Sequence, residues 1–122
     1  MKNKGNKTQN IVIYQAKSGA IELKGDFGKE TIWATQAQIA ELFGIDRTVT
    51  TKHIQNIFKN KELDKNSVSA KFAHTAKDGK IYQVQFYNLD IILAVGYRAN
   101  STYAINFRQW ATKILRNYIV DG

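Results

Sequence analysis

The chain has 122 residues, which is enough for one compact domain with a modest core and too few for two ordinary domains. It contains no cysteine, so disulfides, cysteine zinc sites and thiol catalysis are excluded. With 18 basic and 10 acidic residues its net charge is +8, which favours a polyanion such as nucleic acid as the partner.

A membrane is the competing anionic partner. No apolar run approaches the roughly 18 residues of a spanning helix, and no segment has the pattern of a basic amphipathic helix that lies on a membrane surface. The first ten residues, MKNKGNKTQN, are polar and do not form a secretory signal. We therefore expect no membrane association and a cytoplasmic location.

Residues 1–10 carry three lysines and no acidic residue, which predicts a disordered basic tail. The tail is either simply solvated or an arm that touches DNA phosphates. We expect residues 11–122 to form a single domain. At its start, Ile11–Ala16 and Ala20–Leu23 flank the turn 17–19 and predict a β-hairpin. Thr31–Trp33 is expected to add a short strand that leads into the first helix.

Residues 33–58 indicate two short helices joined at Gly44. Thr35 is a natural N-cap, Gln38 completes a capping box, and Gly44 supplies the left-handed residue that ends the first helix. Asp46 is placed to cap the second helix. This is the outline of a DNA-binding helix-turn-helix, although two helices joined by a glycine turn also occur in domains with no nucleic-acid role.

The second helix of this unit has two different faces. One is apolar and is expected to be buried: Val49, Ile54, Ile57 and Phe58. The other is polar and suits base edges and phosphates: Arg47, Thr48, Thr51, Lys52 and Gln55. Helix-turn-helix units usually place an apolar residue six positions after the turn glycine, where this chain has Thr50. The second helix is therefore either rotated or begins at a different residue.

A second hairpin is predicted after a polar connector at residues 59–66. Ser67–Thr75 and Ile81–Tyr87 flank a turn that contains Asp78-Gly79, a strong hairpin signal. A basic hairpin after a helix-turn-helix is typical of a wing, whose lysines 71, 77 and 80 would reach phosphates. The alternative is that these lysines keep an edge hairpin soluble. His74 is interpreted as an ordinary surface residue.

Two helices are predicted at the end of the chain. Asn88 caps Leu89–Val95, which Gly96 terminates, and Ser101 caps a helix that runs to about Ile119. The aromatic residues of the last helix, Phe107, Trp110 and Tyr118, are expected in the core. Its neighbourhood is basic, with Arg98, Arg108, Lys113 and Arg116. These cations face DNA, an acidic partner or simply solvent.

Residues 87–122, together with residues 33–58, resemble the RhuM family of bacterial virulence proteins. The most specific element is Val95-Gly96-Tyr97-Arg98 followed by Phe107-Arg108-x-Trp110-Ala111-Thr112. The C-terminal half is more distantly similar to the Bro-N domain of phage and viral antirepressors. The resemblance implies the N-terminal domain of a longer regulatory or mobile-element protein, in the bacterial cytoplasm and associated with the nucleoid if it binds DNA. It transfers no catalytic residue.

The predicted fold class is α+β, a winged helix-turn-helix with an N-terminal β-hairpin, a wing hairpin and C-terminal helices. The predicted function is sequence-specific binding of double-stranded DNA, and a homodimer is one expected oligomeric state. The predicted DNA-binding residues are Thr35, Gln36, Arg47, Thr48, Thr50, Thr51, Lys52, Gln55, Lys77 and Lys80. The alternative is a protein-interaction module, antirepressor-like or toxin-associated, that binds an acidic protein.

Catalysis is not expected. His53 and His74 have no carboxylate at the spacing of a metal site or a catalytic pair, and the sequence contains no glycine-rich phosphate loop or nucleophile motif. We therefore expect no enzyme activity, no metal and no small-molecule cofactor.

Overall fold

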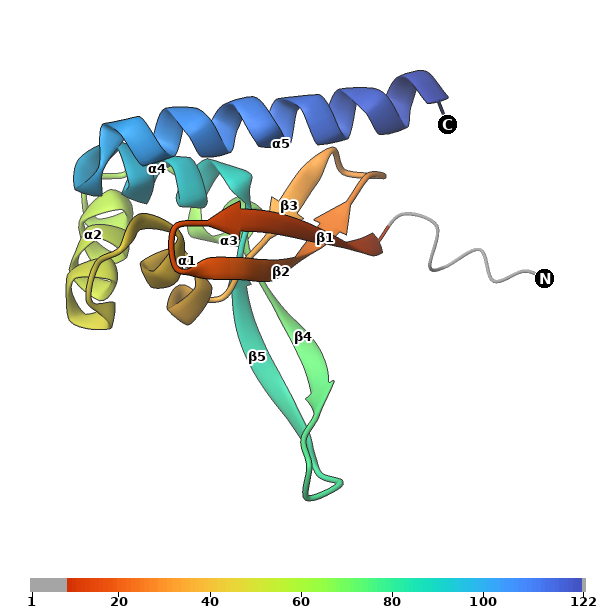
Figure 1. Cartoon of the computed structure of the whole chain (residues 1–122). Helices are drawn as coiled ribbons and strands as arrows, with labels where there is room; N and C mark the ends of the chain where they lie inside the picture. Colours follow the sequence, from red (N-terminus) through yellow and green to blue (C-terminus); the bar gives the residue numbers. More distant parts are fainter. Residues whose placement is uncertain (1–8, 122) are drawn as a thin grey trace.

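A computed structural model describes residues 9–121 as a mixed α/β protein with two antiparallel sheets (Figure 1). The elements in chain order are β1 (Gln9–Ala16), β2 (Gly19–Asp26), β3 (Thr31–Trp33), α1 (Gln36–Phe43), α2 (Arg47–Lys59), α3 (Lys65–Val68), β4 (Ser69–Thr75), β5 (Ile81–Tyr87), α4 (Leu89–Ala99) and α5 (Ser101–Asp121). The predicted α+β composition is confirmed at this level.

The first sheet has the order β1-β2-β3. Its predicted hairpin is confirmed, with Ala16 opposite Gly19 across a two-residue turn. Strand β1 begins at Gln9, so Gln9 and Asn10 belong to the sheet and not to the predicted tail. The rest of that tail, residues 1–8, lies outside the described residues. Along β2, Ile21 and Leu23 face the core while Glu22 is exposed, as expected of a sheet with one buried face.

The predicted start and end of α1 are both confirmed. The Thr35 side chain accepts a hydrogen bond from the Gln38 N–H, and the Gln38 side chain accepts one from the Thr35 N–H, which completes the capping box. Gly44 has φ +64°, the left-handed conformation that ends the helix. Directly before α1, Ala34 pairs with Tyr87 and so links the first sheet to the end of β5.

The predicted end of α4 at Gly96 is wrong, because the helix continues to Ala99. Gly96 serves packing instead: a Cβ atom at this position would lie 2.6 Å from the Phe43 ring. The cap of α5 also differs from the prediction. The Asn100 side chain, and not that of Ser101, accepts a hydrogen bond from the backbone of α5, from the Tyr103 N–H at 3.2 Å.

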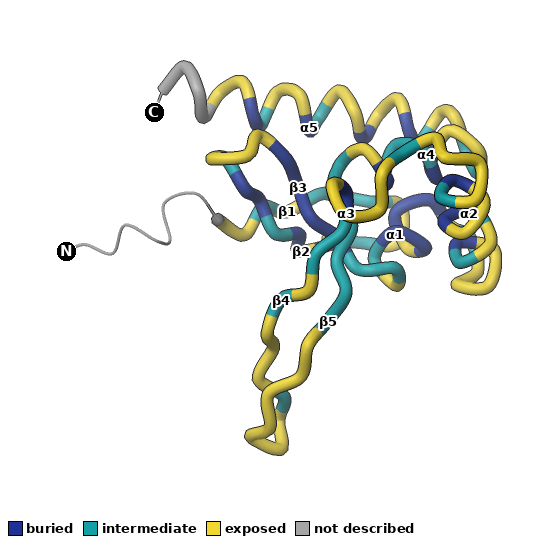
Figure 2. The backbone as a smooth tube through the Cα atoms, turned by 180° about the vertical axis from the view of Figure 1, so that it is seen from behind, coloured by how far each residue is buried: buried dark blue, intermediate teal, exposed yellow. Residues whose placement is uncertain are grey.

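The core lies between the first sheet, α1, α2 and the two C-terminal helices (Figure 2). Helix α5 spans the molecule, and its Phe107 is fully buried. The Tyr14 ring of β1 packs edge-on against Phe107 at 5.0 Å and Trp110 at 4.9 Å. These contacts confirm the core role predicted for Phe107 and Trp110, while the Tyr118 side chain lies outside the described part.

The second hairpin, β4–β5, projects from the body on the side opposite α5 (Figure 1). Its strands follow the predicted ranges except at the start, where Ser67 and Val68 belong to the short helix α3. Val68 is buried and its carbonyl accepts from the Asn88 N–H at 2.9 Å, which ties the connector to the start of α4.

Candidate nucleic-acid interface

Helix α2 is fixed against α1 by polar contacts at its first turns. The Gln36 side-chain amide donates to the Arg47 carbonyl at 3.3 Å and to the Thr51 hydroxyl. The Thr51 hydroxyl in turn donates to the Arg47 carbonyl at 2.9 Å. Ile45 in the turn packs against the core. The orientation of α2 is therefore set by α1 and the turn.

The inner face of α2 consists of Thr50, Ile54 and Ile57, all buried. Thr50 is fully buried, so its inclusion among the predicted DNA-binding residues is corrected. Its hydroxyl donates to the Asp46 carbonyl at 3.0 Å, which satisfies the polar atom and permits burial. Asp46 occupies the predicted N-cap position, although its side chain makes no capping hydrogen bond to α2.

Val49 was predicted to be buried, and it is 39% exposed instead. The cause is the orientation of the helix: Thr50, six places after Gly44, faces the core, and the turn of about 100° per residue directs Val49 toward solvent. We call the solvent-exposed side of α2 its outer face. It consists of seven exposed residues: Arg47, Thr48, Val49, Lys52, Gln55, Asn56 and Lys59. Sequence reasoning missed Val49, Asn56 and Lys59. The position of Thr50 relative to the turn glycine was the signal that could have identified Val49.

The outer face of α2 carries cations and no acidic residue. The long side chains of Arg47, Lys52 and Gln55 are exposed, and they are of the types that contact phosphates and base edges. Thr48 and Val49 are short and lie in the first turn, so they leave room for close approach of a ligand. The arrangement is a positively charged helix surface that the rest of the described chain does not cover.

Three other predicted residues are partly committed to contacts within the protein. Thr35 caps α1, and Gln36 and Thr51 join α1 to α2. All three are half-buried. Their main role is to hold α1 and α2 in place, and they add little to the exposed surface of α2.

The tip of the β4–β5 hairpin carries Lys77 and Lys80, both exposed as predicted. Asp78 between them orders the turn: its carboxylate accepts from the Lys80 N–H and the Tyr82 hydroxyl, each at 2.9 Å. These two hydrogen bonds, that from Lys80 first, lower the pKa of Asp78. The tip therefore holds a defined conformation that presents two cations.

The base of this hairpin is anchored by aromatic contacts. Phe72 packs edge-on against Trp33 at 5.4 Å and against Phe86 at 5.2 Å. The Lys24 ammonium lies 5.3 Å from the centre of the Phe72 ring. Trp33 is itself held by Asp26, whose carboxylate accepts from the indole N–H at 3.3 Å. The hairpin is thus attached to the first sheet at the point where α1 begins.

Arg98 forms an ion pair within the protein. Its guanidinium pairs with the Glu62 carboxylate and also donates to the Ala94 carbonyl at 3.1 Å. The hydrogen bond from Arg98 is the main cause that lowers the pKa of Glu62. This ion pair joins the connector after α2 to α4, so Arg98 acts within the fold.

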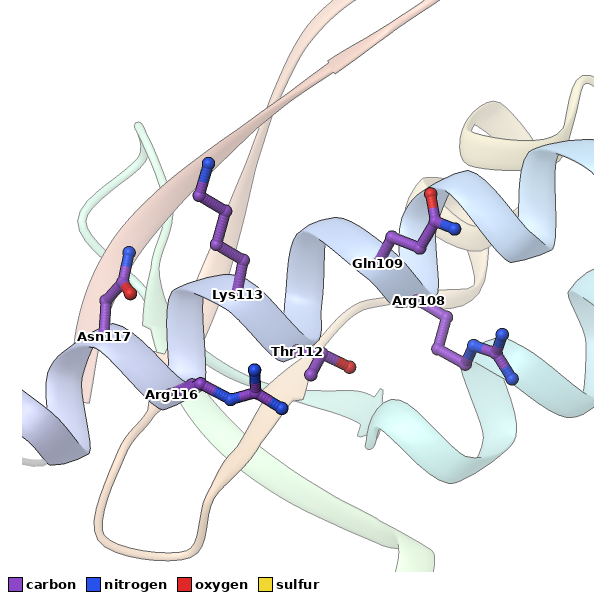
Figure 3. Close-up of a pocket in the computed structure, with 6 residues that line it drawn as sticks. All are labelled: Arg108, Gln109, Thr112, Lys113, Arg116 and Asn117. Atoms are coloured by element: carbon purple, nitrogen blue, oxygen red, sulfur yellow. The ribbon is translucent and has the colours of Figure 1, made fainter.

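A second basic surface lies on α5. Arg108, Lys113 and Arg116 are exposed there, together with Gln109, Thr112 and Asn117, around a shallow depression (Figure 3). Figure 3 shows the six side chains diverging along two sides of the helix, so they do not converge on a small ligand. This surface and the β4–β5 hairpin lie on opposite sides of the body (Figure 1).

Residues 67–122 match the family model of the Virulence protein RhuM family. The resemblance to this family is therefore confirmed for the part of the chain that contains β4, β5, α4 and α5. Helices α1 and α2 lie outside the matched range. No curated protein and no solved structure matches the chain.

Two properties of the described chain bear on other kinds of site. None of its helices combines the length and the apolar composition that a membrane crossing requires. Between residues 9 and 121, histidine and acidic side chains do not gather in groups of three or more that could hold a metal ion.

Proposed function

We propose that this chain is a winged helix-turn-helix domain that binds double-stranded DNA in a sequence-dependent manner. The observation that carries the proposal is the outer face of α2, which is cationic, free of acidic residues and uncovered by the rest of the described chain. In helix-turn-helix proteins the second helix enters the major groove, and residues near its N-terminus contact base edges. Thr48, Val49 and Lys52 occupy that part of α2.

The packing of α1 and α2 supports this proposal. A recognition helix must be held rigidly, because base contacts depend on fixed geometry. The hydrogen bonds from Gln36 hold the first turns of α2, while Ile54 and Ile57 anchor the rest of it in the core. Arg47, at the first position of the helix, is placed to contact phosphate beside the groove.

The β4–β5 hairpin takes the role of the wing. It is joined to the start of α1 through the Ala34–Tyr87 bridge, so it is attached to the same unit as the recognition helix. Its ordered tip presents Lys77 and Lys80, which would neutralise phosphates and carry no base specificity. These contacts make affinity fall with salt, because each neutralised phosphate releases counterions.

The basic surface of α5 favours a second function alongside the first. It lies on the other side of the body from the wing. We therefore expect that a duplex bound at α2 and the wing does not reach it. Its cations, Arg108, Lys113 and Arg116, suit an acidic protein. A role of the chain as a protein-interaction module is thus compatible with DNA binding. We place both activities in the bacterial cytoplasm and assign no catalytic step to the chain.

The proposal is tested by titrating fluorescent duplex DNA with the protein at several salt concentrations. We expect tight binding that weakens steeply as salt rises. The double variant Lys77→Ala/Lys80→Ala should reduce the slope of log affinity against log salt by about two. The matched control, Lys113→Ala/Arg116→Ala, removes the same charge from α5 and should leave the slope unchanged. Absence of binding near physiological salt would refute the proposal.

A further inference from the structure

Strand β1 is one of the two edge strands of the first sheet and pairs only with β2 among the described strands. Its other edge is therefore a row of backbone N–H and C=O groups that lack a backbone partner within residues 9–121. Such an edge is a template for another strand, and proteins usually protect it with charged residues or proline. The sequence of β1, QNIVIYQA, contains neither.

The geometry of the sheet shows which residues of β1 present their backbone at this edge. The Glu22 carbonyl points away from β1, because it accepts from the Gln38 side chain at 2.8 Å. Ile13 is the residue opposite Glu22, so its own N–H and C=O point away from β2. Alternation along the strand gives Ile11 the same direction.

Ile11 and Ile13 also leave their side chains in solvent. They are 71% and 56% exposed, among the most exposed large apolar residues of the described chain. Both lie on the outer face of the sheet, while Val12 and Tyr14 point to the core side. Two adjacent exposed isoleucines on an uncharged edge are typical of a surface that another strand covers.

From these observations we propose that β1 pairs antiparallel with β1 of a second copy, which forms a continuous sheet across a two-fold axis. Charge selects this occupant. An acidic peptide would find no cation on β1, whereas two copies of a chain with net charge +8 repel each other least where the contacting strands are neutral. A two-fold axis also makes one surface serve both partners. This dimer does not depend on the DNA-binding proposal.

The register between the two β1 strands follows from which of their residues lie on the same face of the sheet. Directly opposite residues of an antiparallel ladder lie on the same face of the sheet. An axis through Val12 places Ile11 opposite the partner's Ile13, so that four isoleucines form one apolar cluster on the outer face. This register also uses all of β1 except Ala16, since Gln9 then lies opposite the partner's Gln15.

Sedimentation velocity of the full chain without DNA tests the dimer. We expect a dimer at about 100 µM, a range in which weak but specific association is populated. Ile13→Lys should give a monomer, since it places a charge on the apolar cluster twice per dimer. The control is Ile81→Lys, which introduces the same charge at an isoleucine of the β4–β5 hairpin that is 68% exposed. It should leave the dimer intact. A monomeric wild type, a dimeric Ile13→Lys, or a monomeric Ile81→Lys would overturn the proposal.

The register is tested separately by disulfide crosslinking. The chain has no cysteine of its own, so only the introduced cysteines can form a crosslink. Ile11→Cys and Ile13→Cys are prepared separately and oxidised mildly, alone and mixed. Opposite positions of a hydrogen-bonded pair bring Cα atoms within disulfide range, while positions offset by two residues stay farther apart. We expect disulfide-linked dimers mainly in the mixture. Equal crosslinking of each variant alone, or none in any sample, would overturn the register. Circular dichroism checks that both variants are folded.

Discussion

The Gln36 side-chain amide and the Thr51 hydroxyl form a hydrogen bond that joins the first turns of α1 and α2. The same amide reaches the Arg47 carbonyl at 3.3 Å, so one side chain fixes two points of α2. The direction of α2 therefore depends on a residue of the preceding helix. Polar residues at such a junction have a structural role even where their type also suits DNA contacts.

Gln36→Ala should lower the free energy of unfolding by about 0.5–1.5 kcal/mol, the usual net value of a lost hydrogen bond. Urea denaturation of the free protein measures it. Gln55→Ala is the matched control, because Gln55 is exposed on the outer face of α2 and should leave the stability unchanged. Equal stability of the two variants would show that Gln36 does not hold α2.

Gly96→Ala should destabilise the protein by about 1–3 kcal/mol through overpacking. The added Cβ would lie 2.6 Å from the Phe43 ring and 3.0 Å from the Ala104 Cβ, inside α4 where the backbone cannot move freely. Chemical denaturation gives the value. The double variant Gly96→Ala/Phe43→Leu should lose less than the sum of its single variants, because the smaller side chain vacates the position of the ring. Additive losses would contradict this origin.

The Glu62–Arg98 pair predicts a pH dependence of stability. The pKa of Glu62 is lowered in the folded protein, mainly by the hydrogen bond from Arg98. A lowered pKa contributes stability above the unfolded value, about 4.3, and that stability is lost as pH falls through the folded value. The melting temperature of the wild type should therefore exceed that of Glu62→Gln at neutral pH, by a small amount because both groups are partly exposed. The difference should vanish under acidic conditions, and a difference that persists there would exclude titration of Glu62 as its cause.

Val49 predicts a preference for thymine. An exposed apolar side chain in the first turn of a recognition helix can contact the 5-methyl group of thymine in the major groove. In a duplex selected by the protein from a random pool, replacement of the contacted thymine by uracil should weaken binding by the wild type. Val49→Ala should bind both duplexes with nearly equal affinity. An equal penalty for uracil in the two proteins would place the methyl contact elsewhere.

The sequence predicted most elements because their signals are local. The Thr35 capping box, Gly44 and the Asp78-Gly79 turn each specify backbone geometry within a few residues. The failures arise where tertiary packing decides. Gly96 resembles a helix terminator, yet its lack of a side chain serves the contact with Phe43.

At the candidate site, too, local patterns predicted some positions correctly, and tertiary packing decided the others. The positions of Arg47, Lys52 and Gln55 on the exposed side of α2 followed from helical periodicity. Thr50 was wrongly placed among the DNA-binding residues. The Asp46 carbonyl accepts a hydrogen bond from its hydroxyl, which allows this polar side chain to lie in the core. Thr50 is buried where Val49 was expected to be, so the helix is rotated by one residue relative to the prediction. The composition of the helix alone does not determine this rotation.

The Lys52→Ala variant tests whether the outer face of α2 contacts the bases of DNA. Its affinity for the selected duplex is compared with that of Lys113→Ala, which removes the same charge from α5 on another surface. If Lys52 contacts a base, its removal should cost about 1–3 kcal/mol and relax the sequence preference. Lys113→Ala should bind as the wild type does. Equal affinity and unchanged preference of the Lys52→Ala variant would contradict the account.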